Sequence, residues 1–240
     1  MLEKDSRLIV ALDVDTLQDV KQITTELGDL VHCYKVGMQL YYSQGNAVLT
    51  YLQEQHKNIF LDLKLHDIPN TVAKSAVALA RLGVNLLTVH ALGGPAMLAA
   101  VCNATRDEAA QLGIIPPKIL AVTILTSMDQ QQLQQIGCPS AVDQEVLKLA
   151  KLAQDSGADG VVASPREAGQ IRQQCGSTFL IVTPGIRPSG AALDDQSRVA
   201  SPSQAIASGA THLVIGRPII AAPDRKVAAQ QIWSEMRNVQ

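Results

Sequence analysis

The sequence predicts a (β/α)8 TIM barrel, a closed ring of eight parallel strands in which a helix follows each strand. Short apolar runs alternate with helical patterns along the chain, and that alternation indicates a parallel sheet. A unit of glycine, polar residue and buried strand begins at Gly83, Gly157 and Gly209, as successive strand–helix modules produce. Eight such modules fit one domain over residues 1–240. The alternative, an open doubly wound sheet, requires a glycine-rich turn after the first strand, and none follows Asp13.

Each expected strand is a short buried run, and each expected helix has a start signal or a helical spacing of apolar residues. The strands lie at Leu8–Asp13, Cys33–Val36, Ile59–His66, Gly83–His90, Ile119–Thr126, Gly157–Ser164, Phe179–Thr183 and Gly209–Gly216. Asp15 or Thr16 caps the first helix. The later helices span Gln44–Gln55, Val72–Leu82, Pro95–Leu112, Asp143–Ser156, Pro165–Gln174, Ser201–Ser208 and Arg225–Met236. The glycines that open the repeated units end the preceding helices, where a left-handed backbone favours glycine.

The composition narrows the class of protein. Hydrophobic residues make up 47% of the chain and aromatic residues only 3%, so the expected core is aliphatic. The net charge of −2 gives no basic surface for nucleic acid or an acidic membrane, and no apolar run is long enough for a signal region or a membrane span. Four cysteines without Cys-x-x-Cys spacing indicate reduced thiols of a cytoplasmic protein. The five histidines lack the spacing of metal ligands, so the sequence predicts no metal site.

The stretch Asn58–Val72 carries the densest group of charges. Apolar residues alternate there with Phe60, Asp62, Lys64 and a histidine, which is the two-residue period of a strand. Asp62 and Lys64 should therefore share one face, with their side-chain roots roughly 7 Å apart. Asp67 follows at the strand end. Charges this close together amid apolar residues are costly unless they pair. The spacing alone fits either a structural ion-pair cluster or a reactive site.

The end of this strand also has local signals. Pro69 ends the strand because proline cannot donate to a β ladder. Asn70 or Thr71 is then expected to cap the helix that begins near Val72. The charged residues thus lie where a strand gives way to a helix.

In a (β/α)8 barrel the active site lies at the carboxyl ends of the strands. Polar or glycine residues that could form a site are expected at the end of each of the eight strands. They are Asp13, Lys35, Asp62, Lys64, Asp67, His90, Thr126, Ser127, Ser164, Thr183–Arg187, Gly216 and Arg217. This placement favours a reactive site over a purely structural cluster.

Two features of this end suggest a bound phosphate. Gly216 and Arg217 follow the last strand, where barrels of this class often hold phosphate with backbone N–H groups and a forked arginine charge. Arg187 could join them. Long loops emerge at Ser127–Val142 and Thr183–Val199, and the second has the composition and position of a lid that closes over a ligand.

The run from Asp62 to Thr71, Asp-Leu-Lys-Leu-His-Asp-Ile-Pro-Asn-Thr, resembles the signature of the orotidine 5'-phosphate decarboxylase family. The bare pattern Asp-x-Lys-x-x-Asp is shared by a wider superfamily, whereas the His-Asp-Ile-Pro-Asn-Thr continuation is more specific. The resemblance covers nearly the whole chain and is strongest to the bacterial type. Its other segments are Leu12-Asp13, Lys35–Gly37, Leu125–Ser127, Thr183–Pro188 and Gly216–Ile219.

The resemblance implies the decarboxylation of orotidine 5'-monophosphate to UMP in pyrimidine biosynthesis, without metal or cofactor. It implies that Lys64 protonates C6, that Asp62 lies against the substrate carboxylate, and that Lys35 and Asp67 complete an alternating charge array. Asp13 and Lys35 would meet the ribose, and Thr126 and Ser127 the pyrimidine. The phosphate would be held by Arg187, Gln196, Gly216 and Arg217. Asp67 and Thr71 would reach into the site of a second subunit, so the resemblance also implies a homodimer.

Two alternatives remain. Sugar-phosphate enzymes of the same superfamily, a Mg²⁺-dependent decarboxylase or an aldolase, share Asp-x-Lys-x-x-Asp and use the metal to hold an enediolate. The continuation from His66 to Thr71 and the Thr126–Ser127 pair argue against them. The other alternative is a nucleotide-binding or scaffold barrel with an inactive site, against which the intact set of Lys35, Asp62, Lys64 and Asp67 argues.

Overall fold

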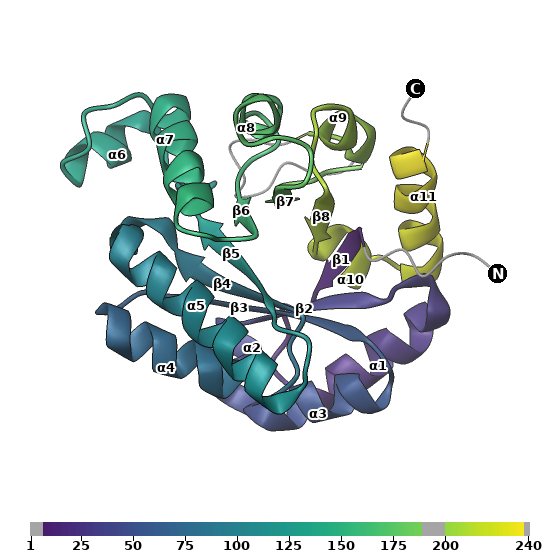
Figure 1. The fold of residues 1–240 in the computed structure, drawn as a ribbon. Helices are drawn as coiled ribbons and strands as arrows, with labels where there is room; N and C mark the ends of the chain where they lie inside the picture. The colour runs from purple at the N-terminus through teal and green to yellow at the C-terminus, as the bar shows by residue number, and fades with distance from the viewer. Residues whose placement is uncertain (1–6, 189–199, 238–240) are drawn as a thin grey trace.

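The computed structural model describes residues 7–188 and 200–237. Its eight strands are parallel and close into one barrel in chain order, with β1 paired to β8 (Figure 1). The strands are β1 (Leu8–Ala11), β2 (Cys33–Gly37), β3 (Asn58–Leu65), β4 (Leu86–His90), β5 (Lys118–Val122), β6 (Gly160–Val162), β7 (Leu180–Thr183) and β8 (His212–Ile215). The predicted fold class is confirmed.

Helices surround the barrel, and α4 and α5 pack side by side against it (Figure 1). The α-helices are α1 (Leu17–Leu27), α2 (Met38–Gln44), α3 (Asn46–Glu54), α4 (Pro69–Ala80), α5 (Gly94–Leu112), α6 (Gln130–Gln135), α7 (Val142–Asp155), α8 (Ala168–Cys175), α9 (Pro202–Ala207), α10 (Arg217–Ile220) and α11 (Arg225–Arg237). Two 3-10 turns, η1 (Gly28–Leu30) and η2 (Ala91–Gly93), complete the set. Among the residues described, every helix is too short or too polar to cross a membrane.

The apolar side chains form two cores. The larger lies between the barrel and its helices and is aliphatic, as the composition predicts. The smaller fills the inside of the barrel, with Ile9, Ala11, Cys33, Phe60, Leu86, Leu120, Val182 and Val214. Burying one large aliphatic or aromatic side chain contributes about 1.5–3 kcal/mol. The packed interior thus holds the carboxyl ends of the strands in fixed positions.

The three repeated glycines have the backbone that the repeat predicts. Their φ angles are positive, 69° at Gly83, 87° at Gly157 and 102° at Gly209. At Gly209 an added Cβ would also lie 3.0 Å from the Cβ of Arg172. These turns set where β4, β6 and β8 begin.

Several expected boundaries are wrong. A single helix over Gln44–Gln55 does not form, because Gly45 adopts a φ of 59° and separates α2 from α3. The helix after β3 starts earlier than expected, at Pro69, and Ile68 occupies the N-cap position in place of Asn70 or Thr71. Proline is well suited to the first helical position, since its missing N–H would have no partner there.

The loop Ser127–Val142 contains a helix that periodicity does not predict. Asp129 and Gln132 form a capping box that starts α6. The short α10 after β8 lies outside the expected set as well. The strand β5 ends at Val122, four residues before the expected end. Beyond it the Thr123 hydroxyl donates to the Val162 carbonyl oxygen, so the chain stays joined to β6.

Candidate active site

The strand β3 is irregular where its charges lie. Leu61 pairs with Leu87 of β4, yet the next pair is Leu65 with Val89, so the register shifts between them. Lys64 has a φ of 52° inside this break. A left-handed backbone at a residue with a Cβ costs roughly 1–2 kcal/mol. The strict alternation expected through Lys64 is therefore wrong, although both charged side chains still reach the same cavity.

Four of the predicted residues form one ion-pair chain at the ends of β1, β2 and β3. The Lys64 ammonium lies 2.9 Å from Oδ1 of Asp62. Oδ2 of Asp62 lies 3.8 Å from the Lys35 ammonium, which is 3.0 Å from Oδ1 of Asp13. The side chains of Lys35 and Asp62 are 12% and 13% exposed, so solvent screens this pair little. The charges alternate in sign along the chain Asp13, Lys35, Asp62, Lys64.

A hydroxyl group and a glycine next to these residues help to hold the charged side chains in place. The Thr88 hydroxyl of β4 donates to Oδ1 of Asp62 at 3.0 Å and accepts the Lys64 N–H at 2.8 Å. An added Cβ at Gly37 would lie 3.0 Å from the Lys35 ammonium. Sequence reasoning missed Thr88, because it lies in the middle of an apolar strand. Its only signal is a polar residue at a position that the alternation buries.

A cavity of about 200 Å³ lies over these charges. Lys35, Asp62 and Lys64 supply its charged lining, and Thr126 also lines it. Its remaining lining is apolar, from Phe60, Val122, Ile124, Leu125, Val162, Pro184 and Val214. Charges beside an apolar wall act in a low local dielectric, where their interaction with a developing charge is stronger than in water.

Other predicted residues lie around this cavity. Gly216 follows β8, and an added Cβ there would come within 3.2 Å of Oδ2 of Asp13, so glycine lets the two segments approach. Arg217 is exposed at the start of α10. Arg187 is half-buried after β7, and its backbone N–H donates to the Ala200 carbonyl oxygen. Gln196 lies outside the described residues.

Asp67, Thr71 and Ser127 do not join the charge chain within this subunit. Asp67 is exposed, and its Oδ1 accepts the Ile68 N–H at 2.6 Å. Thr71 is exposed in the first turn of α4, and Ser127 is exposed after β5. Among the described residues, no ion pair links Asp67 to Lys64.

Two histidines lie beside the charges. His66 and His90 stack with their ring centroids 5.3 Å apart. Burial lowers the pKa of His90, and the neighbouring His66 and Lys64 lower it further. Its Nδ1 accepts the Leu92 N–H at 3.5 Å, which suits the neutral imidazole. His90 is thus a structural, uncharged neighbour of the site.

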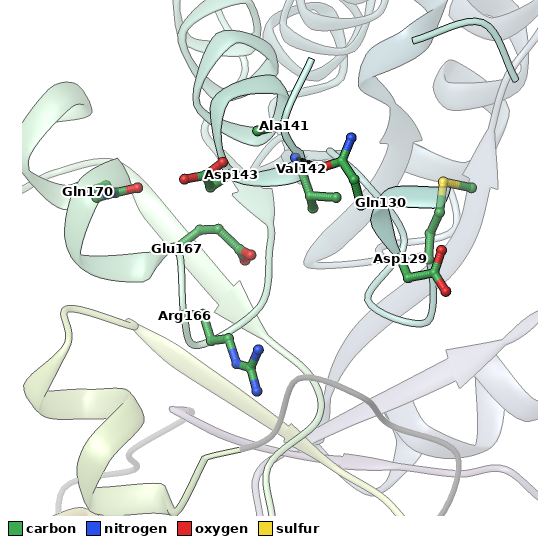
Figure 2. Close-up of a pocket in the computed structure, with 9 residues that line it drawn as sticks. Asp129, Gln130, Ala141, Val142, Asp143, Arg166, Glu167 and Gln170 are labelled. Atoms are coloured by element: carbon green, nitrogen blue, oxygen red, sulfur yellow. Dashed lines mark hydrogen bonds between the residues drawn. The ribbon is translucent and has the colours of Figure 1, made fainter. Parts of the chain in front are cut away.

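A larger cavity of about 560 Å³ lies beside α6 and the starts of α7 and α8. In Figure 2 the Glu167 side chain points into the space below α7, whereas Arg166 points away from Asp143. Two of its polar residues take part in local structure, since Asp129 caps α6 and Gln130 accepts the Val142 N–H. None of the predicted site residues lines it. The smaller cavity is the candidate site because three residues of the charge chain, Lys35, Asp62 and Lys64, line it.

Within residues 7–188 and 200–237, no three His, Cys, Asp or Glu side chains form a group that could hold a metal ion.

Residues 6–232 match the model of the "Orotidine 5'-phosphate decarboxylase / HUMPS family". The chain belongs to this family. A relative from Moorella thermoacetica named orotidine 5'-phosphate decarboxylase is 48% identical, over 97% of this chain and 93% of its own. Another with that name, from Geotalea daltonii, is 50% identical over 98% and 97%. The crystal structure of orotidine 5'-phosphate decarboxylase from Lactobacillus acidophilus has a TM-score of 0.86 and 43% identity, covering 97% of this chain and 99% of that one.

The resemblance that the sequence carries is therefore confirmed at the level of the family. The curated relatives at 46–50% identity carry the decarboxylase name. Their names favour that chemistry over a sugar-phosphate reaction.

Proposed function

We propose that this protein decarboxylates orotidine 5'-monophosphate to UMP without metal or cofactor. The observation that carries the proposal is the Asp62–Lys64 pair, 2.9 Å apart at the mouth of a partly apolar cavity. The family membership and the decarboxylase names of the relatives support the same reaction. The pair supplies one group to face the substrate carboxylate and one to replace it with a proton.

The reaction breaks the bond between C6 and the carboxyl carbon, and the electron pair stays on C6 as carbon dioxide leaves. The pyrimidine ring delocalises that pair poorly, so a fixed positive charge must stabilise it. The ammonium of Lys64 supplies this charge and then gives its proton to C6, and solvent returns a proton to the amine. Asp62 would face the departing carboxylate and disfavour it in the ground state.

The remaining predicted residues bind the rest of the nucleotide. Asp13 and Lys35 meet the ribose, and Thr126 with Ser127 meets the pyrimidine. The phosphate is held by Arg187, Gln196, Gly216 and Arg217. Binding energy from this remote phosphate can be used to close the site over C6 and exclude water. Arg217 supplies the fixed charge after β8 that this role needs.

The active unit is a homodimer in this proposal, with Asp67 and Thr71 completing the site of the other subunit. Support comes from their exposure near α4, beside the exposed apolar side chains of Ile68 and Leu92. Exposed apolar groups around functional residues are typical of an interface.

Mixing two inactive variants, Lys64→Ala and Asp67→Ala, tests this arrangement. A mixed dimer would contain one site with both native residues. Random pairing of equal amounts should therefore restore about a quarter of the native activity. Subunit exchange between the two variants must first be verified. If activity is then still not restored, the shared site is contradicted.

The chain is further proposed to act as a single barrel domain in the cytoplasm. Its four cysteines are free thiols. Burial raises the pKa of Cys33 to about 12 and that of Cys102 to about 11, so both stay protonated and unreactive. Such thiols suit a reducing compartment.

The deciding experiment follows the ultraviolet absorbance of orotidine 5'-monophosphate mixed with the purified protein in excess EDTA. Loss of the orotate band with formation of UMP is expected. Lack of change in EDTA, followed by turnover of a sugar phosphate once Mg²⁺ is added, would instead assign the sugar-phosphate chemistry.

A further inference from the structure

The Thr88 hydroxyl forms hydrogen bonds to both members of the Asp62–Lys64 pair. Its residue is fully buried in β4. The oxygen accepts the backbone N–H of Lys64 at 2.8 Å and donates its own hydrogen to Oδ1 of Asp62 at 3.0 Å. The hydroxyl has a single hydrogen, and it is donated to Asp62. The oxygen is therefore left to accept the Lys64 N–H.

The shifted register explains why a hydroxyl is needed here. Between the pairs Leu61–Leu87 and Leu65–Val89, β3 has three residues and β4 has only Thr88. The Lys64 N–H points at this side chain and bonds to its oxygen. A buried N–H without an acceptor is strongly disfavoured. Thr88 therefore supplies the acceptor that the Lys64 N–H lacks where the β3–β4 hydrogen-bond ladder is interrupted.

The same contact orients the Asp62 carboxylate. Oδ1 of Asp62 receives Thr88 and the Lys64 ammonium, and Oδ2 faces the Lys35 ammonium at 3.8 Å. Two donors on one oxygen leave the carboxylate little freedom to rotate. Rotation would break the alternation of charges along Lys35, Asp62 and Lys64. Thr88 and the two lysines thus hold the carboxylate in one orientation.

We propose that Thr88 is a positioning residue for the reacting pair, acting through the Lys64 backbone and the Asp62 carboxylate. The inference rests on the proposed decarboxylation. Thr88 touches no substrate in this scheme, and its effect is on geometry. Because small displacements of a reacting group cost large factors in rate, loss of the hydroxyl should lower kcat far more than it weakens nucleotide binding.

The test compares Thr88→Val, Thr88→Ala and Thr88→Ser. Valine keeps the shape and removes both hydrogen bonds, whereas serine keeps both. We expect kcat to fall about 100-fold in Thr88→Val and Thr88→Ala and to stay within about fivefold of the parent in Thr88→Ser. The Kd for UMP should change less than about threefold in all three, since Thr88 lies away from the phosphate residues.

Thr105→Val is the matched control, because Thr105 is also buried and its hydroxyl bonds only to carbonyl oxygens of its own helix α5. Its loss should lower the melting temperature with kcat within about twofold of the parent. If Thr88→Val does not fold, the Ala and Ser variants decide the question. Equal kcat in those two, or a Thr88→Val enzyme as fast as the parent, would overturn the positioning role. An inactive parent would instead count against the proposed decarboxylation.

Discussion

Of the two cavities described above, the smaller contains most of the chain of paired charges and the larger contains none of it. The larger, about 560 Å³, is lined by loops and helix starts, and one of its polar residues, Asp129, caps α6. The smaller, about 200 Å³, is lined mainly by strand ends, and its charges are held by one another. Preorganised charge on rigid strands stabilises a transition state, whereas room alone does not. Support of charged side chains by rigid strands, more than cavity volume, therefore favours the smaller cavity as the site.

The largest expected effect comes from removing the central charge of the smaller cavity. Lys64→Ala should lower kcat by at least about 10⁴-fold, because both the fixed charge and the proton donor are lost. UMP affinity and the melting temperature should stay close to those of the parent. Lys74→Ala, which removes an exposed lysine from α4, is the control and should be fully active. Turnover within about tenfold of the parent, a barrier change of roughly 1.4 kcal/mol, would contradict the assignment.

A smaller effect is expected from the phosphate end of the same site. Arg217→Ala should raise the Kd for UMP about 10- to 100-fold, as expected for loss of a charge-assisted hydrogen bond. Isothermal titration measures it directly. Arg81→Ala, which removes an arginine paired with Glu108 on the helices, serves as the control and should bind UMP normally. Unchanged affinity in Arg217→Ala would move the phosphate site elsewhere.

The neutral His90 beside the charges gives a pH-dependent prediction. Its pKa in the folded protein lies below the ordinary value of 6.5, so the unfolded chain binds the proton more readily. The free energy of unfolding should therefore decrease as the pH falls below about 6.5. His90→Asn keeps an acceptor for the Leu92 N–H and should show a weaker decrease. Urea unfolding of both proteins at pH 7.5 and 5.5 measures the difference, and equal slopes would show that His90 does not contribute.

The smallest effect is expected in the larger cavity. Asp143→Asn and Gln170→Ala each change a polar residue that lines this cavity and leave the charge chain unaltered. Both variants should keep kcat and KM within about twofold of the parent. A loss of kcat there comparable with that of Lys64→Ala would remove the distinction between the two cavities.

The sequence was enough for the barrel, because eight apolar runs and the repeated glycines report on local backbone and burial. It also placed Asp13, Lys35, Asp62 and Lys64 at one end, since all parallel strands finish on the same side. It could not give the shift between β3 and β4, which arises only when two strands distant in sequence are paired. For the same reason it missed Thr88. The start of α4 was placed too late because Pro69 was interpreted as the end of a strand. Proline is equally suited to the first position of a helix.

The pairing of the first strand with the last has a consequence for synthesis. Leu8 pairs in register with Leu213, so the barrel cannot close until β8 has been synthesised. At 5–20 residues per second, making the intervening roughly two hundred residues takes about 10–40 s. Asp13, Lys35, Asp62 and Lys64 are made early in that time, well before Gly216 and Arg217. The nascent chain thus carries these four charged residues before β8 exists to close the barrel, so the proposed site can form only after β8 has been made.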